Sequence, residues 1–88
     1  MNPTTTTGDN ATGQRPLTFG ERAVGLTFNP SGDPAVQKCK EDFAHVIDRL
    51  DELRNSTTDT EVKRMASIAI TEAQTAQMWA VKAITWRG

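Results

Sequence analysis

The chain has 88 residues, enough for one small domain whose own core is marginal, because small domains bury a smaller fraction of their surface than large ones. Its 10 basic and 11 acidic side chains give a formal charge of -1, which argues against a general attraction to long nucleic acid or to an anionic membrane. A single cysteine excludes an internal disulfide, and no stretch approaches the roughly 20 apolar residues that span a bilayer. We therefore expect a cytoplasmic protein that gains stability by oligomerisation.

Residues 1–16 are dominated by Thr, Gly, Asn, Gln and Pro, so burial cannot offset the entropy of ordering them. We predict a flexible tail over 1–16 and a helical hairpin domain with an N-terminal arm over 17–88. Apolar side chains recur between Leu17 and Asn29, but Gly20 and Gly25 interrupt any long helix. This stretch is expected to lie on the helical body as an arm or short element.

The first long helix is predicted to begin after a loop that contains two prolines and a glycine. Asp33 suits the N-cap position and Pro34 the first helical position, and the helix should run to about Arg54. Apolar residues recur at alternating spacings of three and four, which places them on one stripe of this helix: Val36, Cys39, Phe43, Val46, Leu50 and Leu53.

A second helix, antiparallel to the first, is predicted from about Asp59 to Trp86, with Thr58 to Glu61 as its capping box. A seam of mostly small side chains should let the first helix approach closely: Met65, Ala69, Ala73, Ala76, Ala80 and Ala83. Ile70 and Trp79 represent further apolar sides, more than a lone hairpin can cover. The predicted fold is all-α, an antiparallel two-helix hairpin with an N-terminal arm that assembles into a compact homo-oligomer.

The sequence does not support a catalytic or metal site. His45 is the only histidine and has no identified partner, while Cys39 lies inside the apolar stripe. The carboxylates of Asp48, Asp51 and Glu52 fall on a solvated charged face. We predict no catalytic residue, no metal ligand and no cofactor.

The loop from Phe28 to Pro34 is the first candidate binding site. Free backbone amides at a helix start favour an anion, Phe28 can stack on a base, and Lys38 and Lys40 follow within two turns. Composition alone favours a simpler interpretation, in which the loop is a plain turn and Phe28 a hydrophobic anchor beside the helix.

The end of the second helix is the other candidate. Thr75, Trp79, Lys82 and Trp86 share one helical face, where indoles can stack on bases and a lysine can meet a phosphate. An oligomer interface with a lysine reaching into solvent fits the same spacing equally well.

These residues resemble a known family. The stretch from Thr27 to Gly32, then Val36 and Lys40, and finally the run from Ala76 to Thr85 look like the hairpin domain shared by phage anti-CBASS and Thoeris anti-defence proteins. The resemblance covers about Gly20 to Arg87, and its most specific part is Met78 to Thr85.

The resemblance implies a helical-hairpin subunit that assembles into a compact hexamer. It implies a sponge in the cytoplasm of the infected host bacterium, which binds cyclic dinucleotides such as cyclic GMP-AMP, cyclic trinucleotides or cyclic ADP-ribose isomers without cleaving them. The defence effectors of the host are thereby deprived of their activating signal.

The resemblance also implies roles for individual residues. Phe28 is the nearest match to an aromatic residue that stacks on a base, and Lys40 to a lysine that contacts phosphate. A tyrosine–arginine pair stands in place of Phe28 and Asn29 in the family form compared. Lys82 matches a basic residue of a separate trinucleotide pocket, where the family form has arginine.

The predicted ligand-binding residues are Phe28, Asn29, Ser31, Lys40, Trp79, Lys82 and Trp86. Two hypotheses of other classes are a structural or protein-binding helical oligomer and, third, an enzyme that degrades the nucleotide.

Overall fold

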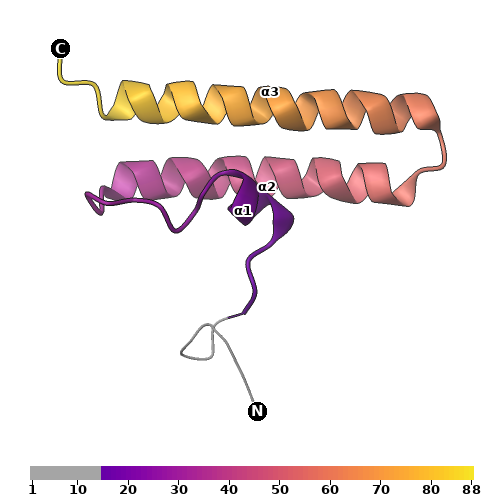
Figure 1. Cartoon of the computed structure of the whole chain (residues 1–88), viewed down its shortest axis with the longest axis horizontal. Coiled ribbons are helices and arrows are strands. Elements are labelled where there is room, and N and C mark those ends of the chain that lie inside the picture. Colours follow the sequence, from indigo (N-terminus) through magenta and orange to yellow (C-terminus); the bar gives the residue numbers. More distant parts are fainter. Residues whose placement is uncertain (1–14) are drawn as a thin grey trace.

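The computed structural model describes residues 15–88, which contain three helices and no strand. Helix α1 spans Phe19–Ala23, α2 spans Pro34–Ser56 and α3 spans Thr60–Ile84. The two long helices lie antiparallel, and α1 rests against the middle of α2 (Figure 1). The predicted all-α hairpin is confirmed. Most of the predicted tail, residues 1–16, lies outside the described residues.

Helix α1 is short because its two ends are fixed locally. At its start, the Thr18 hydroxyl accepts a hydrogen bond from the Glu21 backbone amide, while the Glu21 carboxylate accepts one from the Thr18 amide. This reciprocal capping box satisfies two otherwise free amides. The helix ends before Gly25, whose φ of 64° suits glycine. This capping box was not predicted from the sequence, although the Thr18 to Glu21 spacing matches the motif.

The bounds of the long helices lie within two residues of the prediction. The carboxylate of Asp33 caps α2 by accepting a bond from the Ala35 amide at 2.8 Å, as predicted. The capping box predicted at Thr58 is wrong, because the N-cap of α3 is Asp59, which accepts from the amides of Glu61 and Val62. A carboxylate one residue closer to the helix replaces the hydroxyl in that role.

A small core joins the three helices. Val24, Ala44, Ile47 and Ile70 are buried together, and Ile47 has no exposed surface. Helix α1 approaches α2 so closely that a Cβ atom on Gly20 would lie 2.1 Å from the Ala44 carbonyl oxygen. The Gly20 amide also donates to the Asp48 carboxylate at 2.7 Å. A glycine at position 20 is therefore required for this contact.

The predicted apolar stripe of α2 does not coincide with its buried side. Burial follows Val36, Lys40, Ala44 and Ile47, whereas half of Val46 and nearly half of Leu53 remain exposed. Val46 and Leu53 lie about 100–120° around the helix from Ile47. The predicted apolar stripe is therefore only partly buried, because Lys40 and Ala44 occupy the side of α2 that faces the rest of the chain.

The small-residue seam predicted on α3 is confirmed only in part: Ala73 packs against the core, and Ala69 and Ala80 are half-buried. The buried side of α3 contains Ala66, Ile70 and Gln77, whereas Met65, Ala76 and Ala83 are exposed. This exposed set lies about 120–140° around the helix from Ile70. Helix α3 therefore meets α2 through Ile70, which had been predicted on a different side.

One side of the hairpin carries exposed apolar side chains that no other segment of residues 15–88 covers. Helix α1 contacts α2 at Asp48, and Gln74 of α3 donates to the Ala23 carbonyl at 3.5 Å, so the arm covers the side where Asp48 and Gln74 lie. Helical period places several exposed apolar residues of both long helices on the opposite side. We call this the uncovered face, and it contains Val46, Leu53, Met65, Ala76 and Ala83.

Among the described residues, neither long helix carries an apolar run sufficient to cross a membrane.

Candidate functional site

The loop of residues 24–33 returns from α1 to the start of α2, at the open end of the hairpin where α3 ends (Figure 1). Two tight turns shape it: the Phe28 amide donates to the Gly25 carbonyl at 2.9 Å, and the Gly32 amide donates to the Asn29 carbonyl at 3.0 Å. Gly25 and Gly32 both have positive φ angles, which glycine adopts without strain. The Asn29 side-chain amide then joins the loop to the Asp33 carbonyl at 3.0 Å.

A cavity of about 200 Å³ lies between this loop and the ends of the two long helices. We call it the loop cavity. It brings together four residues predicted as ligand contacts, Phe28, Asn29, Ser31 and Lys40. The remaining lining consists of Pro30, Val36, Val81 and Thr85. Small-molecule pockets usually measure about 300–1,000 Å³, so this cavity can enclose only part of a nucleotide-sized ligand.

Lys40 is the most unusual residue of the cavity, because only 6% of its surface is exposed. Its ammonium donates to the Gly25 carbonyl at 3.0 Å and also to the Phe28 carbonyl. The ammonium lies 5.5 Å from the centre of the Phe28 ring, within cation–π range. No carboxylate of residues 15–88 forms an ion pair with it. The charge is thus compensated mainly by backbone carbonyls.

Phe28 stands at the edge of the loop cavity with 70% of its surface exposed. A buried hydrophobic anchor would have lost most of that exposure, so the simpler interpretation of this residue does not fit the structure. Its ring is available for stacking by a ligand or for contact with another subunit.

The loop cavity has an apolar wall and a polar edge. Val36, Pro30 and Val81 supply the apolar surface. The Thr85 hydroxyl donates to the Val81 carbonyl at 2.8 Å, and its lone pairs can still accept a hydrogen bond. Ser31 is exposed at the edge. Such a surface suits a flat, weakly polar ring with hydrogen-bonding groups at its rim.

The second predicted site does not join this cavity within one chain. Trp79 and Trp86 are 66% and 63% exposed, and the Lys82 ammonium lies 5.5 Å from the centre of the Trp86 ring. By helical period Trp79 lies about 160° around α3 from Val81, whereas Lys82 lies about 100° from it and Trp86 follows the end of the helix. Lys82 and Trp86 lie side by side, and neither they nor Trp79 line the loop cavity.

The contribution of α3 to the cavity was missed by the sequence analysis. Val81 and Thr85 line it, four residues apart, and continue the buried side that contains Ile70 and Gln77. Their spacing could have identified them if the inner side of α3 had been known. The two tryptophans drew attention instead because large aromatic residues are the stronger signal in a sequence.

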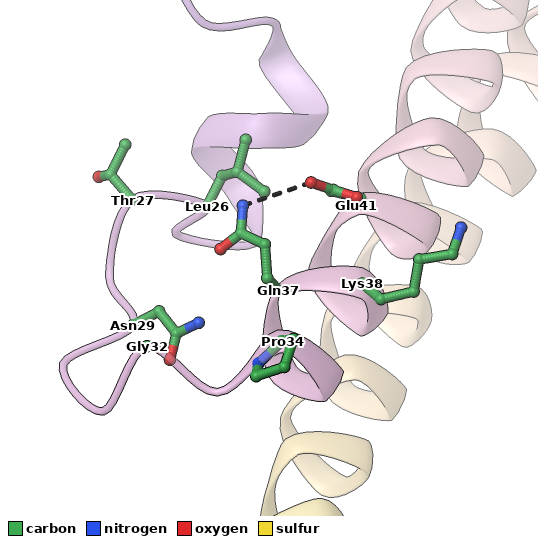
Figure 2. A pocket seen from close by; sticks show the side chains of 8 residues that line it. All are labelled: Leu26, Thr27, Asn29, Gly32, Pro34, Gln37, Lys38 and Glu41. Atoms are coloured by element: carbon green, nitrogen blue, oxygen red, sulfur yellow. Dashed lines mark hydrogen bonds between the residues drawn. The ribbon is translucent and has the colours of Figure 1, made fainter.

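A wider hollow of about 680 Å³ lies on the other side of the same loop (Figure 2). Asn29 and Gly32 border it from the loop, and Gln37 and Glu41 border it from α2, linked by a hydrogen bond of 3.4 Å. Lys38 extends away from the loop and pairs with Asp42 at 2.9 Å, and this hydrogen bond raises the pKa of Lys38. The buried lysine belongs to the loop cavity rather than to this hollow, which makes the loop cavity the better candidate site.

Reactive groups are not assembled elsewhere in residues 15–88. No cluster of three or more His, Cys, Asp or Glu side chains occurs in that range. Burial raises the pKa of the Cys39 thiol, which disfavours the nucleophilic thiolate. His45 is exposed on α2.

Comparison with known proteins identifies the family. The family model described as Acb2/Tad1, hairpin domain, matches residues 21–85 and therefore includes α2, α3 and the loop cavity. No curated protein sequence and no solved structure matches the chain. The match agrees with the anti-CBASS and Thoeris anti-defence resemblance of the sequence. The chain belongs to the Acb2/Tad1 hairpin-domain family.

Proposed function

We propose that this chain is a non-catalytic sponge for cyclic oligonucleotide immune signals, namely cyclic dinucleotides such as cyclic GMP-AMP and also cyclic trinucleotides. By holding the signal in the cytoplasm of the infected bacterium, it lets a phage evade CBASS defence. Its membership of a ligand-sequestering family supports this proposal. The observation that favours it most is the loop cavity, which combines an exposed aromatic ring, an apolar wall and a buried cation.

In this proposal a base stacks on Phe28 and packs against Val36 and Val81, while the phosphates lie at the polar edge near Ser31 and Asn29. Lys40 adds positive charge beneath that edge. A sponge must keep free signal below the threshold of the effector, so slow release of the ligand matters more than fast capture.

The ligand also needs surface that one chain does not supply, because the loop cavity is small. We propose that the protein is a homo-oligomer in which neighbouring subunits pack against the uncovered face. The family resemblance implies that this oligomer is a hexamer. Trp79, Lys82 and Trp86 then contribute to a second pocket for trinucleotides or to a subunit interface. Their exposure is compatible with both roles.

Binding with intact recovery of the ligand is the decisive test. The protein is titrated calorimetrically with cyclic dinucleotides, cyclic trinucleotides and cyclic ADP-ribose isomers, then denatured, and the released ligand is identified. We expect tight binding of a cyclic oligonucleotide and its unchanged recovery. Binding of cyclic ADP-ribose isomers alone would instead indicate Thoeris inhibition, recovery of a cleaved product would indicate an enzyme, and no binding would indicate a protein-binding oligomer.

Phe28→Ala tests the site itself. Stacking of a base on an aromatic ring contributes about 1–3 kcal/mol, so we expect the variant to bind the preferred ligand about tenfold more weakly, or worse. Met78→Ala is the matched control, because Met78 is also large and exposed but does not line the loop cavity. Equal affinities of the two variants would place the ligand elsewhere.

A further inference from the structure

We infer that Gln77 is a positioning residue for ligand capture. When a phosphate of the ligand draws the Lys40 ammonium toward itself, the buried side-chain amide of Gln77 donates to the loop carbonyl that the lysine releases. The inference rests on the proposed function, because it concerns the ligand-bound state.

Gln77 is a buried polar side chain without a hydrogen-bond partner in the described part of the chain. Only 6% of its surface is exposed, as for Lys40, and these two are the only buried polar side chains among residues 15–88. Within that range the side-chain amide of Gln77 forms no hydrogen bond, whereas its neighbour Gln74 donates to the Ala23 carbonyl. Buried polar groups nearly always have a partner, so this amide calls for an explanation.

The register of the hairpin places Gln77 at the level of Lys40. Ile47 of α2 and Ile70 of α3 are buried together in the core. Lys40 lies seven residues before Ile47 and Gln77 seven residues after Ile70, which is about 10.5 Å along each helix and nearly two whole turns. Because the two helices are antiparallel, Lys40 and Gln77 lie at the same level on the buried sides of α2 and α3 (Figure 1).

The next pair of residues toward the open end of the hairpin supports this register. Val36 and Val81 lie four residues beyond Lys40 and Gln77, and both line the loop cavity. Lys40 lines the same cavity. The two buried polar side chains therefore form a layer directly beneath the loop cavity.

A ligand phosphate should change the hydrogen bonds of this layer. In the free chain the Lys40 ammonium donates to the Gly25 and Phe28 carbonyls and pairs with no carboxylate of residues 15–88. A phosphate at the edge of the cavity supplies that anion, and a charge-assisted hydrogen bond is stronger than one to a neutral carbonyl. The ammonium then moves toward the phosphate and leaves at least one of the two carbonyls without its donor.

The Gln77 amide can replace the ammonium at that carbonyl. An unpaired carbonyl in a partly buried place is costly, and a side-chain amide offers two N–H donors. Gln77 therefore destabilises the free chain slightly and stabilises the complex. The amide lets the lysine reach the phosphate while the loop keeps its shape.

Unfolding in urea without ligand separates this role from a structural one. Gln77→Leu removes the amide and keeps a side chain of similar size, so we expect a midpoint equal to or higher than that of the unaltered chain, because leucine needs no partner. A lower midpoint would show that the amide already has a partner in the free chain, which would overturn the inference.

The affinity for the preferred cyclic oligonucleotide should change in the opposite direction. We expect Gln77→Leu to bind at least about fivefold more weakly in a calorimetric titration. Gln74→Leu is the matched control, because it makes the same change on the same helix at an amide that donates to the Ala23 carbonyl of the arm at 3.5 Å. This control should bind within about twofold of the unaltered chain. A smaller loss in Gln77→Leu than twofold, or the same loss in both variants, would contradict the inference.

Nuclear magnetic resonance follows the Gln77 amide in the unaltered chain. We expect no coupling through a hydrogen bond from its side-chain nitrogen to the carbonyl carbons of Gly25 and Phe28 in the free protein, and a coupling to one of them in the complex. Gln77 signals that stay unchanged on saturation with ligand would refute the positioning role. If the unaltered protein binds no cyclic nucleotide, the proposed function fails and this inference with it, whereas binding that leaves Gln77 unaffected overturns the inference alone.

Discussion

Arg15 and Glu21 form the strongest charged contact of the arm. The Arg15 guanidinium donates two hydrogen bonds to the Glu21 carboxylate, at 2.7 and 2.6 Å, and these lower the pKa of Glu21 from 4.5 to about 2. A carboxyl group whose pKa is lowered by folding stabilises the fold above its ordinary pKa. This contribution is lost as the pH falls from about 4.5 toward 2.

Removing the arginine should return Glu21 toward ordinary behaviour. In Arg15→Gln we expect the pKa of Glu21 to rise toward 4.5, although the hydrogen bonds to Thr18 keep it somewhat lower. A titration of the Glu21 side-chain carboxyl carbon by nuclear magnetic resonance measures this directly. Arg64→Gln is the control, since Arg64 pairs with Glu61 at an exposed position and should leave Glu21 unchanged. A Glu21 pKa that remains near 2 in Arg15→Gln would show that Arg15 is not the cause.

At the scale of single residues, the sequence predicted which loop residues lie together, but not the contacts that each side chain makes. The loop cavity brings together Phe28, Asn29, Ser31 and Lys40, as predicted, because these residues are close in the chain and flank a helix start. The burial of Lys40 could not be predicted, because its acceptors are backbone carbonyls of a loop whose path depends on where α1 docks. Val81 was missed because it reaches the cavity only through the register of the hairpin.

The start of α3 provides a test at the scale of one element. Asp59→Ala removes the only side-chain acceptor for the Glu61 and Val62 amides among residues 15–88, so we expect a loss of about 1 kcal/mol in the free energy of unfolding. Thr58→Ala should change it by no more than a few tenths. Urea denaturation measures both. An equal loss in the two variants would return the cap to Thr58, where the sequence motif had suggested it.

Helix positions were predictable and helix orientation was not. Caps and prolines act on the backbone within a few residues, so Asp33 and Pro34 were sufficient to locate the start of α2. The apolar period shows which positions avoid water, but it does not distinguish contact with the same chain from contact with another. Val46 and Leu53 belong to the predicted stripe and yet are about half exposed in the single chain.

The whole molecule has one covered and one uncovered face, and the proposed oligomer depends on that difference. We expect Leu53→Glu to weaken self-association, because a carboxylate buried in an apolar contact loses its hydration without gaining a partner. Analytical ultracentrifugation should show the unaltered chain well above its monomer mass of 9.6 kDa and the variant shifted toward that mass.

Thr71→Glu is the control for this experiment, because it also places a carboxylate at an exposed position of a long helix, but helical period puts Thr71 about 120–140° around α3 from the uncovered face. The same shift in both variants would indicate a general effect of charge rather than loss of an interface. An unaltered chain that sediments as a monomer would contradict the proposed assembly.

The connection between α2 and α3 is only Thr57 to Asp59, and this has a consequence for the order of folding. Short-range contacts close at little entropic cost, so a hairpin with such a turn forms rapidly, as helical proteins generally do. The arm closes much longer loops, since Gln74 and its acceptor Ala23 are 51 residues apart in the chain. The arm and the loop that follows it are therefore the last segments to reach their native positions and the first to leave them.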